Sequence, residues 1–411
     1  MKKNFFFTCV IAILLMSCNN QGEELISSLS PQEKQNAFLV PENQAVNQAL
    51  AFFSAQEKTL PASKRAKAKR RVQSSSKEGV TTSQAGVYII NFEDNGGFAV
   101  VSADKRDGAT VYLASPEGRF DENDAMNQEL LSLVSDYQNS AIASYSFNPD
   151  KGDGVQTETT IVMENYGPLL STCWHQGNPF NKELCDVFGV SSIDVGCVPV
   201  AIGQIVNYYQ YPASINGETL NWGLISQATG LESYHTSATD AASHLLYLIG
   251  GRLGINYPYE SGASYSQAKS AFRSFGYNFS EKSGFDSNVI RTQVASGNPV
   301  YMRGQNSTVG HAWVADGFMK VKTEYRLYDD NGNLVENTEL NDYNYDNIYD
   351  YVHLNLGWRN GSLVYRNSRF EYVSDVGHRI WTYSNIFDFT SIGGTECVFN
   401  DEIKLLYNFS H

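Results

Sequence analysis

Cysteine and histidine are scarce in this chain. Its 411 residues include 6 cysteines and 7 histidines, and neither a Cys-x-x-Cys pair nor a histidine cluster has zinc-ligand spacing. We therefore expect no catalytic metal and no other cofactor. Cys173 and Cys185 could form a disulfide in an exported protein, with Cys397 left over, but the spacing alone does not decide between a disulfide and thiols.

Positive charge is also in short supply. The 30 lysines and arginines are outnumbered by 44 aspartates and glutamates, which gives a net charge of −14. This balance argues against nucleic acid as the main partner. One local exception is Lys64–Arg71, where six of eight residues are basic. We interpret it as an exposed loop, either a solvated run of charge or a processing site for a trypsin-like enzyme.

Long apolar runs are absent after the N-terminus. Lys2 and Lys3 precede an apolar run from Phe5 to Met16, which is followed by Ser17-Cys18. The run is too short for a stable membrane-spanning helix and is typical of a secretory signal. Its ending resembles a bacterial lipoprotein signal, so we predict a signal peptide at 1–17 and a lipid on Cys18. An ordinary secretory signal with an incidental cysteine is the alternative.

The expected location follows from that signal. Residues 18–30 form a polar, acidic tether, and no later segment approaches membrane-spanning length. Attachment would therefore be by the lipid on Cys18 alone. We expect the protein in the bacterial cell envelope, on the outer membrane or cell surface.

The first candidate for chemistry is a cysteine at the start of an amphipathic helix. Apolar residues in 197–209 recur at i, i+3, i+4 and i+7, which predicts one buried helical face. Pro199 suits the first turn, and Pro212 lies beyond the end. Cys197 would thus lie where unpaired N–H groups and the helix dipole lower a thiol pKa and make it reactive. The alternative is a small buried cysteine beginning a core helix.

A candidate base lies far along the chain. His311 follows the strand-like segment 299–302 and precedes a second one at 312–315. An imidazole on a strand that faces a thiol on a helix is the arrangement of a Cys–His pair. Taken alone, such a histidine is more often a core residue.

Three further side chains could complete a catalytic centre. Gln176 lies 21 residues before Cys197, and its amide could donate to a developing oxyanion together with a backbone N–H. Asn355 lies 44 residues after His311 and could orient the imidazole, with the Trp358 indole shielding that bond. The order Gln, Cys, His, Asn is that of papain-like cysteine peptidases.

With these residues in place, the chain resembles the streptopain-like family of cysteine peptidases. The likeness runs from about residue 155 to the C-terminus and rests on four ordered segments: Gln176–Asn181, Val195–Pro212, Val309–Gly317 and His353–Trp358. It implies a catalytic domain in which Cys197 is the nucleophile and His311 the base. It also implies that Gln176 lies in the oxyanion hole and Asn355 near the histidine. Leu356 stands where the family usually has tryptophan, so the resemblance does not extend to an indole at that position.

The N-terminal half has its own pattern. A helical period at 45–55 is followed by a hairpin signal, in which 87–92 and 98–102 flank an Asp-Asn-Gly-Gly turn. A short strand at 110–113 and a helix at 123–140 come next. This pattern resembles the inhibitory prodomain that precedes streptopain-like catalytic domains. An independent α+β module without contact to the active site is the alternative.

These patterns predict an α+β protein. We expect an inhibitory prodomain at 31–150 and a catalytic domain at 155–411, joined by a polar linker at about 146–160 in which Lys151 offers a cleavable bond. Helices are expected at 197–209, 238–249 and 265–275, with strands from about residue 299. Helices first and strands second is the papain-like two-lobed layout, with a cleft between the lobes. Residues 329–332 and 342–350 should be acidic surface loops.

Our interpretation is a lipid-anchored proenzyme of an endopeptidase that cleaves proteins or peptides and is inhibited by its own prodomain. Its biological role would be virulence or nutrient acquisition, and the catalytic domain could be released after cleavage. Three alternatives remain: a Cys–His amidase or transferase of the same superfamily, an inactive binding-only relative, and a surface adhesin.

Overall fold

A computed structural model describes most of the chain from Leu39 to His411. The described residues are 39–59, 72–78, 86–104, 111–116, 118–122, five positions between 127 and 138, 155–230, 234–305, 310–328, 334–336, 345–357, 362–366, 369–373, 379–383 and 401–411. Several predictions lie outside them: the signal, Cys18, the tether, the basic run at 64–71, Lys151, the loop at 329–332, Trp358 and Cys397.

The N-terminal region, residues 39–138, is a helix on an antiparallel meander. Helix α3 (Glu42–Thr59) covers strands β1 (Val72–Glu78), β2 (Val87–Phe92), β3 (Phe98–Ser102) and β4 (Val111–Ser115). The predicted hairpin is confirmed, since β2 pairs with β3 around the short 3-10 turn η2 (Glu93–Asn95). Gly97 in that turn has φ 100°, and a Cβ there would lie 2.1 Å from the Ser115 carbonyl oxygen. The five described positions of the predicted helix at 123–140 are all helical.

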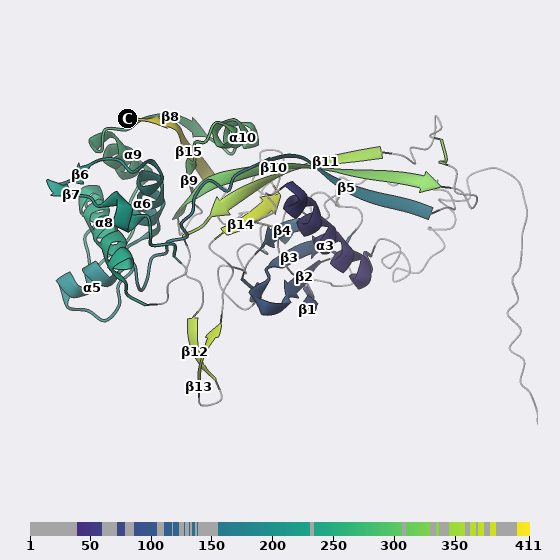
Figure 1. Ribbon diagram of the computed structural model, residues 1–411, viewed down its shortest axis with the longest axis horizontal. Coiled ribbons are helices and arrows are strands. Elements are labelled where there is room, and N and C mark those ends of the chain that lie inside the picture. The colour runs from purple at the N-terminus through teal and green to yellow at the C-terminus, as the bar shows by residue number, and fades with distance from the viewer. Residues whose placement is uncertain are drawn as a thin grey trace, which may run out of the picture.

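A cluster of helices forms one end of the molecule (Figure 1). It consists of α5 (Lys182–Phe188), α6 (Cys197–Tyr209), α7 (Trp222–Ile225), α8 (Ser237–Leu253) and α9 (Tyr265–Ser274), with the small hairpin β6 (Ser214–Ile215) and β7 (Glu218–Thr219). The three predicted helices of this region are confirmed as α6, α8 and α9. Leucine and isoleucine side chains of α6 and α8 form the centre of this cluster's core.

Long strands make up the rest of the C-terminal region, as predicted. They are β5 (Val155–Tyr166), β8 (Asn278–Ser283), β9 (Val300–Gln305), β10 (Gly310–Tyr328), β11 (Tyr345–Asn355), β14 (Arg379–Tyr383) and β15 (Asp401–Ser410), with helix α10 (Ser287–Ala295) and a separate hairpin, β12 (Ser362–Arg366) and β13 (Arg369–Val373). The helices-first, strands-second layout and the α+β class are therefore confirmed.

Two predicted irregular segments are strands instead. The predicted linker at 146–160 was wrong from Val155 onward, because 155–166 pairs along β10. The predicted loop at 342–350 was wrong from Tyr345 onward, because 345–355 pairs with β10 on its other side. In both cases polar residues form a strand because pairing with β10 gives their backbone N–H and C=O groups hydrogen-bond partners. Between β10 and β11, Tyr325 also stacks on Tyr345 with ring centroids 4.6 Å apart.

One sheet unites the two regions. Its strand order is β1-β2-β3-β4-β14-β11-β10-β9-β15-β8, with β5 added on β10. The junction is the antiparallel pair β4–β14, where Leu113 lies opposite Thr382 and Ala114 opposite Trp381. Tyr351 reinforces it, since its hydroxyl donates to the Val111 carbonyl at 3.1 Å.

The same two regions share one hydrophobic core. Buried side chains of α3 and β2–β4 belong to the same apolar cluster as those of α10, β10 and β11. Phe52 of α3 packs edge-on against Tyr351 of β11, with ring centroids 5.0 Å apart. The N-terminal region is thus packed against the C-terminal sheet rather than tethered beside it. Within the residues described, no helix is both long and apolar enough to span a membrane.

Candidate active site

Cys197 begins helix α6, as the sequence predicts. The residue before it, Gly196, has φ 94°, and a Cβ there would lie 2.0 Å from the Ser261 carbonyl oxygen. Only glycine fits that close approach. The chain therefore enters the helix directly after a tight backbone contact, which fixes the direction of the Cys197 side chain.

The sulfur of Cys197 faces backbone N–H groups from two elements. The N–H groups of Cys197 and Val198 come from the helix start, and that of Ala312 comes from β10. Ala312 directly follows His311 in the chain, so this part of β10 lies against the N-terminus of α6. The structure thus places the backbone of the residue after His311 against the sulfur of Cys197.

The acidity of both groups is set by burial. Desolvation raises the pKa of the Cys197 thiol, and the three N–H groups and the charge of Arg303 offset this only in part. Desolvation likewise lowers the pKa of His311 to about 4. The expected lowering of the thiol pKa by the helix start is therefore wrong for this conformation, because the loss of water outweighs the dipole. At neutral pH the pair is a thiol beside a neutral imidazole.

The tautomer of His311 follows from its hydrogen bond. The ring is buried, and Nε2 lies 2.8 Å from the carbonyl oxygen of Leu356. A carbonyl can only accept, so Nε2 carries the proton and Nδ1 carries the lone pair. The ring also stacks on Trp313, with centroids 5.9 Å apart and planes 17° apart. A base of fixed orientation results.

Asn355 lies beside this site but makes different contacts from those expected. Its side-chain nitrogen donates to the carbonyl of Thr172 at 2.7 Å and to Oε1 of Gln204 at 2.9 Å. The carbonyl that holds the His311 ring belongs instead to the next residue, Leu356. Because a backbone carbonyl makes that bond, the leucine at a position where tryptophan is usual does not remove it.

Gln176 lies next to the loop that leads into α6. Its carbonyl accepts from the N–H of Val195 at 3.0 Å, two residues before Cys197, and the residue is half-buried. Its segment is therefore adjacent to the nucleophile's loop. The assignment of its amide to an oxyanion hole stays a prediction.

Gln204 is a site residue that the sequence reasoning missed. Its side chain is 1% exposed. Its Oε1 accepts from the Trp174 N–H at 3.2 Å and from Thr172 Oγ1 at 3.3 Å, and its amide pairs with that of Asn355. One glutamine thereby ties α6 to the Gln176 segment and to the end of β11. A signal was present, since Gln204 is a polar residue inside an otherwise apolar stretch of the helix.

A second buried histidine supports the same strands. His353 Nδ1 lies 2.6 Å from Asp316 Oδ1, and both side chains are almost fully buried. The other carboxylate oxygen of Asp316 accepts from the Leu170 N–H at 3.0 Å. This pair joins β10, β11 and the segment that follows β5, so it holds the strands that carry His311 and Asn355.

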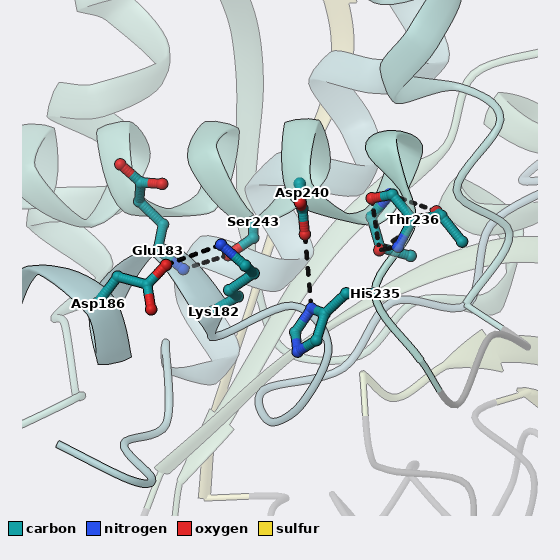
Figure 2. A network of polar contacts seen from close by, with 8 residues as sticks. Lys182, Glu183, Asp186, His235, Thr236, Asp240 and Ser243 are labelled. Carbon is teal, nitrogen blue, oxygen red and sulfur yellow. Dashed lines mark hydrogen bonds and ion pairs between the residues drawn. The ribbon is translucent and has the colours of Figure 1, made fainter.

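The helical end carries a polar network that joins α5 to α8 (Figure 2). Lys182 pairs with Asp186 at 2.7 Å, the N–H of Glu183 donates to Ser243 Oγ at 2.9 Å, and His235 lies 3.4 Å from Asp240. The two ion pairs are exposed and contribute little stability each. Among the residues that the structure describes, no group of three or more His, Cys, Asp or Glu is arranged to hold a metal ion.

The possible disulfide is not formed. Cys185 on α5 is a free thiol, whereas the Cys173 sulfur lies 3.2 Å from the Thr229 carbonyl. Cys173 and Cys185, whose pairing the sequence left open, are therefore not joined to each other in this structure.

A thiol at a helix start, with a histidine on the strand whose backbone meets it, is the arrangement that the sequence predicts for a cysteine peptidase. The sequence profiles agree. Residues 174–363 match the Peptidase C10 family, and residues 37–141 match the Spi protease inhibitor. The chain thus carries a C10 cysteine endopeptidase domain of the streptopain family behind a Spi-like inhibitor region.

Individual relatives are more distant. The chain is similar to streptopain of Streptococcus pyogenes, with 26% identity over 287 residues, 58% of this chain and 70% of the relative. It is also similar to the thiol protease/hemagglutinin PrtT of Porphyromonas gingivalis, with 23% identity over 277 residues, which is 57% of this chain but only 31% of the relative.

Among solved structures, a fragment of Prevotella intermedia prointerpain A matches 82% of this chain and 98% of its own length. The identity of this match is 17% and its TM-score is 0.46.

Proposed function

We propose that this chain is a latent endopeptidase that hydrolyses peptide bonds in proteins through Cys197 and His311. The observation that supports this most strongly is the His311 tautomer. Since Nε2–H is committed to the Leu356 carbonyl, Nδ1 is the basic nitrogen, and β10 holds the ring beside the N–H of Ala312 that meets the sulfur.

The reaction then follows in two halves. Nδ1 of His311 takes the proton of the Cys197 thiol, and the sulfur attacks the scissile carbonyl carbon. The oxyanion is stabilised by N–H groups at the helix start and by the Gln176 amide. The imidazolium gives its proton to the amine as the C–N bond breaks. The amine departs, and the acyl part of the substrate stays bound to the Cys197 sulfur as a thioester. Nδ1 next takes a proton from water as hydroxide attacks the thioester, and the acid product leaves with the thiol restored.

The N-terminal region keeps the enzyme latent in this proposal. Two observations support it: residues 37–141 match a protease inhibitor, and they share a core with the C-terminal sheet. The neutral thiol and imidazole agree with a resting state, because a thiolate is the competent nucleophile. Cutting the linker near Lys151 would remove the covalent tie but leave the shared core intact. Full activity would then require the N-terminal region to dissociate or be degraded.

Anchorage in the cell envelope by a lipid on Cys18 is part of the same proposal. It rests on the sequence of residues 1–18 alone. Metabolic labelling with a radioactive fatty acid tests it, with Cys18→Ala as the control that should lose both the label and the membrane fraction. A labelled Cys18→Ala chain would contradict the assignment.

Paired incubations test the catalytic proposal. Purified wild-type chain and Cys197→Ala are put through the same activation step and then incubated separately with casein, and the products are followed by gel and by N-terminal sequencing. We expect the variant to fold but to lose activity by several orders of magnitude, in line with about 10⁴–10⁶ for loss of a nucleophile. Casein cleavage retained by Cys197→Ala would overturn the mechanism. Covalent labelling of Cys197 by a thiol-directed peptide analogue, without casein cleavage, would point to an amidase or transferase.

A further inference from the structure

A cationic side chain stands beside the nucleophile on the strand next to His311. Arg303 is on β9, and its register partner on β10 is Ala312, the residue whose N–H faces the Cys197 sulfur. The positive charge of Arg303 lowers the pKa of the Cys197 thiol, against the larger effect of burial, which raises it. The guanidinium therefore lies close to the place where a peptide bond would be attacked.

The guanidinium is held in place by backbone on both sides. Its Nη1 donates to the carbonyl of Ala263 at 3.0 Å. Its Nη2 lies over Gly310, where an added Cβ would come within 3.2 Å of it. Gly310 directly precedes His311, so the cation lies near the segment that carries the base as well as near the thiol. Arg303 is half-buried, which leaves part of the group open to a ligand.

Among the described residues, Arg303 also has no carboxylate partner. Two nearby cations do have one: Arg291 of helix α10 pairs with Glu164 at 2.6 Å, and Lys320 of β10 pairs with Asp350 at 3.1 Å. No carboxylate in the described part of the chain lies within ion-pair distance of Arg303. The protein as a whole is acidic, at −14, so this local positive charge stands out against the surrounding field.

We propose that Arg303 binds a carboxylate of the substrate next to the scissile bond, so that the enzyme favours peptides with an aspartate or glutamate there. This proposal rests on the peptidase function proposed above and names its substrate class. A partly desolvated guanidinium gains most from an anion, because its planar N–H groups match a carboxylate with two parallel hydrogen bonds. The bond to Ala263 uses Nη1, and the other donors of the fork remain to reach the substrate.

Two small alkylating reagents test the charge at the site without any assumption about sequence preference. Iodoacetate is an anion and iodoacetamide is its neutral analogue, and the Cys197 thiolate displaces iodide from either. The ratio of their two rates cancels the thiolate fraction, so a change in thiol pKa does not disturb it. Rates are followed by mass spectrometry of the peptide that carries Cys197, on the full-length preparation after activation.

We expect the iodoacetate-to-iodoacetamide ratio to fall about two- to fivefold in Arg303→Gln, which is the range of a partly exposed ion pair. Arg303→Lys should keep most of the preference. The matched control is Arg252→Gln, which removes an arginine bonded to Ser274 on the helices and should leave the ratio unchanged. In the wild type, 1 M salt should lower the ratio, because the screening length there is about 3 Å. An unchanged ratio in both Arg303→Gln and high salt would overturn the proposal.

Peptide pairs then test the substrate class. The peptides of each pair differ at a single position next to the cleaved bond, where one has glutamate and the other glutamine. One pair tests each side of the bond, and kcat/KM is compared within each pair. We expect the wild type to favour glutamate at one position, and Arg303→Gln to lose that preference while still cleaving the glutamine peptide. Failure of iodoacetamide to label Cys197 would contradict the peptidase proposal itself. Normal labelling and cleavage with no preference for glutamate would contradict only the role of Arg303.

Discussion

Replacing Gln204 by leucine should destabilise the protein far more than an ordinary polar-to-apolar change within a core helix. Leucine is similar in size but makes none of the bonds that this glutamine forms with Trp174, Thr172 and Asn355. The Trp174 N–H and the Asn355 amide would then remain buried without these partners. Since each such group costs about 1–3 kcal/mol, we expect a loss of about 3–5 kcal/mol in the free energy of unfolding.

The assay is urea unfolding followed by circular dichroism. It is done in a Cys197→Ala background so that self-digestion cannot distort the baseline. Gln204→Leu should lower the midpoint with the slope unchanged. A loss below about 1 kcal/mol would refute the reasoning, because the glutamine would then be no more than a space-filling residue.

A double-mutant cycle separates the pair from its surroundings. Asn355→Leu should also be destabilising, since it leaves the Gln204 amide and the Thr172 carbonyl without this partner. The double variant should lose less than the sum of the two single losses, by about 1–3 kcal/mol, because removing both amides leaves fewer buried polar groups unpaired. Strict additivity would show that the two amides do not act as a pair.

The cycle also tests what Asn355 does in catalysis. If it positions the segment that carries Gln176, Asn355→Ala should lower kcat and stability together while the pH profile of kcat/KM stays in place. It should also lower turnover much less than His311→Ala, which removes the base itself. A shifted pH profile in Asn355→Ala would mean instead that the asparagine acts on the imidazole.

Two further predictions concern the histidine. Leu356→Trp should change kcat/KM little, because the carbonyl of residue 356 holds the ring; a loss of more than about tenfold in peptide cleavage would show that the side chain matters. The free energy of unfolding should fall as the pH drops from 6.5 to 4, because the folded pKa of His311 is about 4 and the unfolded state binds the proton first. The loss should reach about 2–3 kcal/mol at pH 4.5. In the Cys197→Ala background, the free energy of unfolding of His311→Gln should fall by that amount less between pH 6.5 and 4.5 than that of the chain with His311. An equal fall in both proteins would contradict the buried neutral imidazole.

Features encoded in local pattern were predictable from the sequence. The apolar period of 197–209 gave the bounds of α6, and the Asp-Asn-Gly-Gly turn gave the β2–β3 hairpin. The candidate pair, Cys197 and His311, also came from local motifs. The structure then placed the two motifs side by side.

Features that depend on contacts between distant segments were not predictable. The polar stretches at 155–160 and 345–350 are strands because β10 pairs with both, and nothing in their own composition identifies that partner. The direction of the thiol pKa shift was predicted wrongly because a helix start is visible in a sequence, whereas the desolvation of the sulfur by the surrounding fold is not. The contact between Asn355 and Gln204 joins residues 151 positions apart, so neither residue alone indicates it.

The junction between β4 and β14 has a consequence for the chain once the N-terminal region is removed. Strand β14 would become the border of the remaining sheet, with its backbone groups at Trp381 and Thr382 exposed for new hydrogen bonds. The apolar face that α3 and the N-terminal meander cover would be bared at the same time. Such a border is a template for strand addition, so a freshly activated enzyme would be prone to self-association or to capture of an extended segment from another protein.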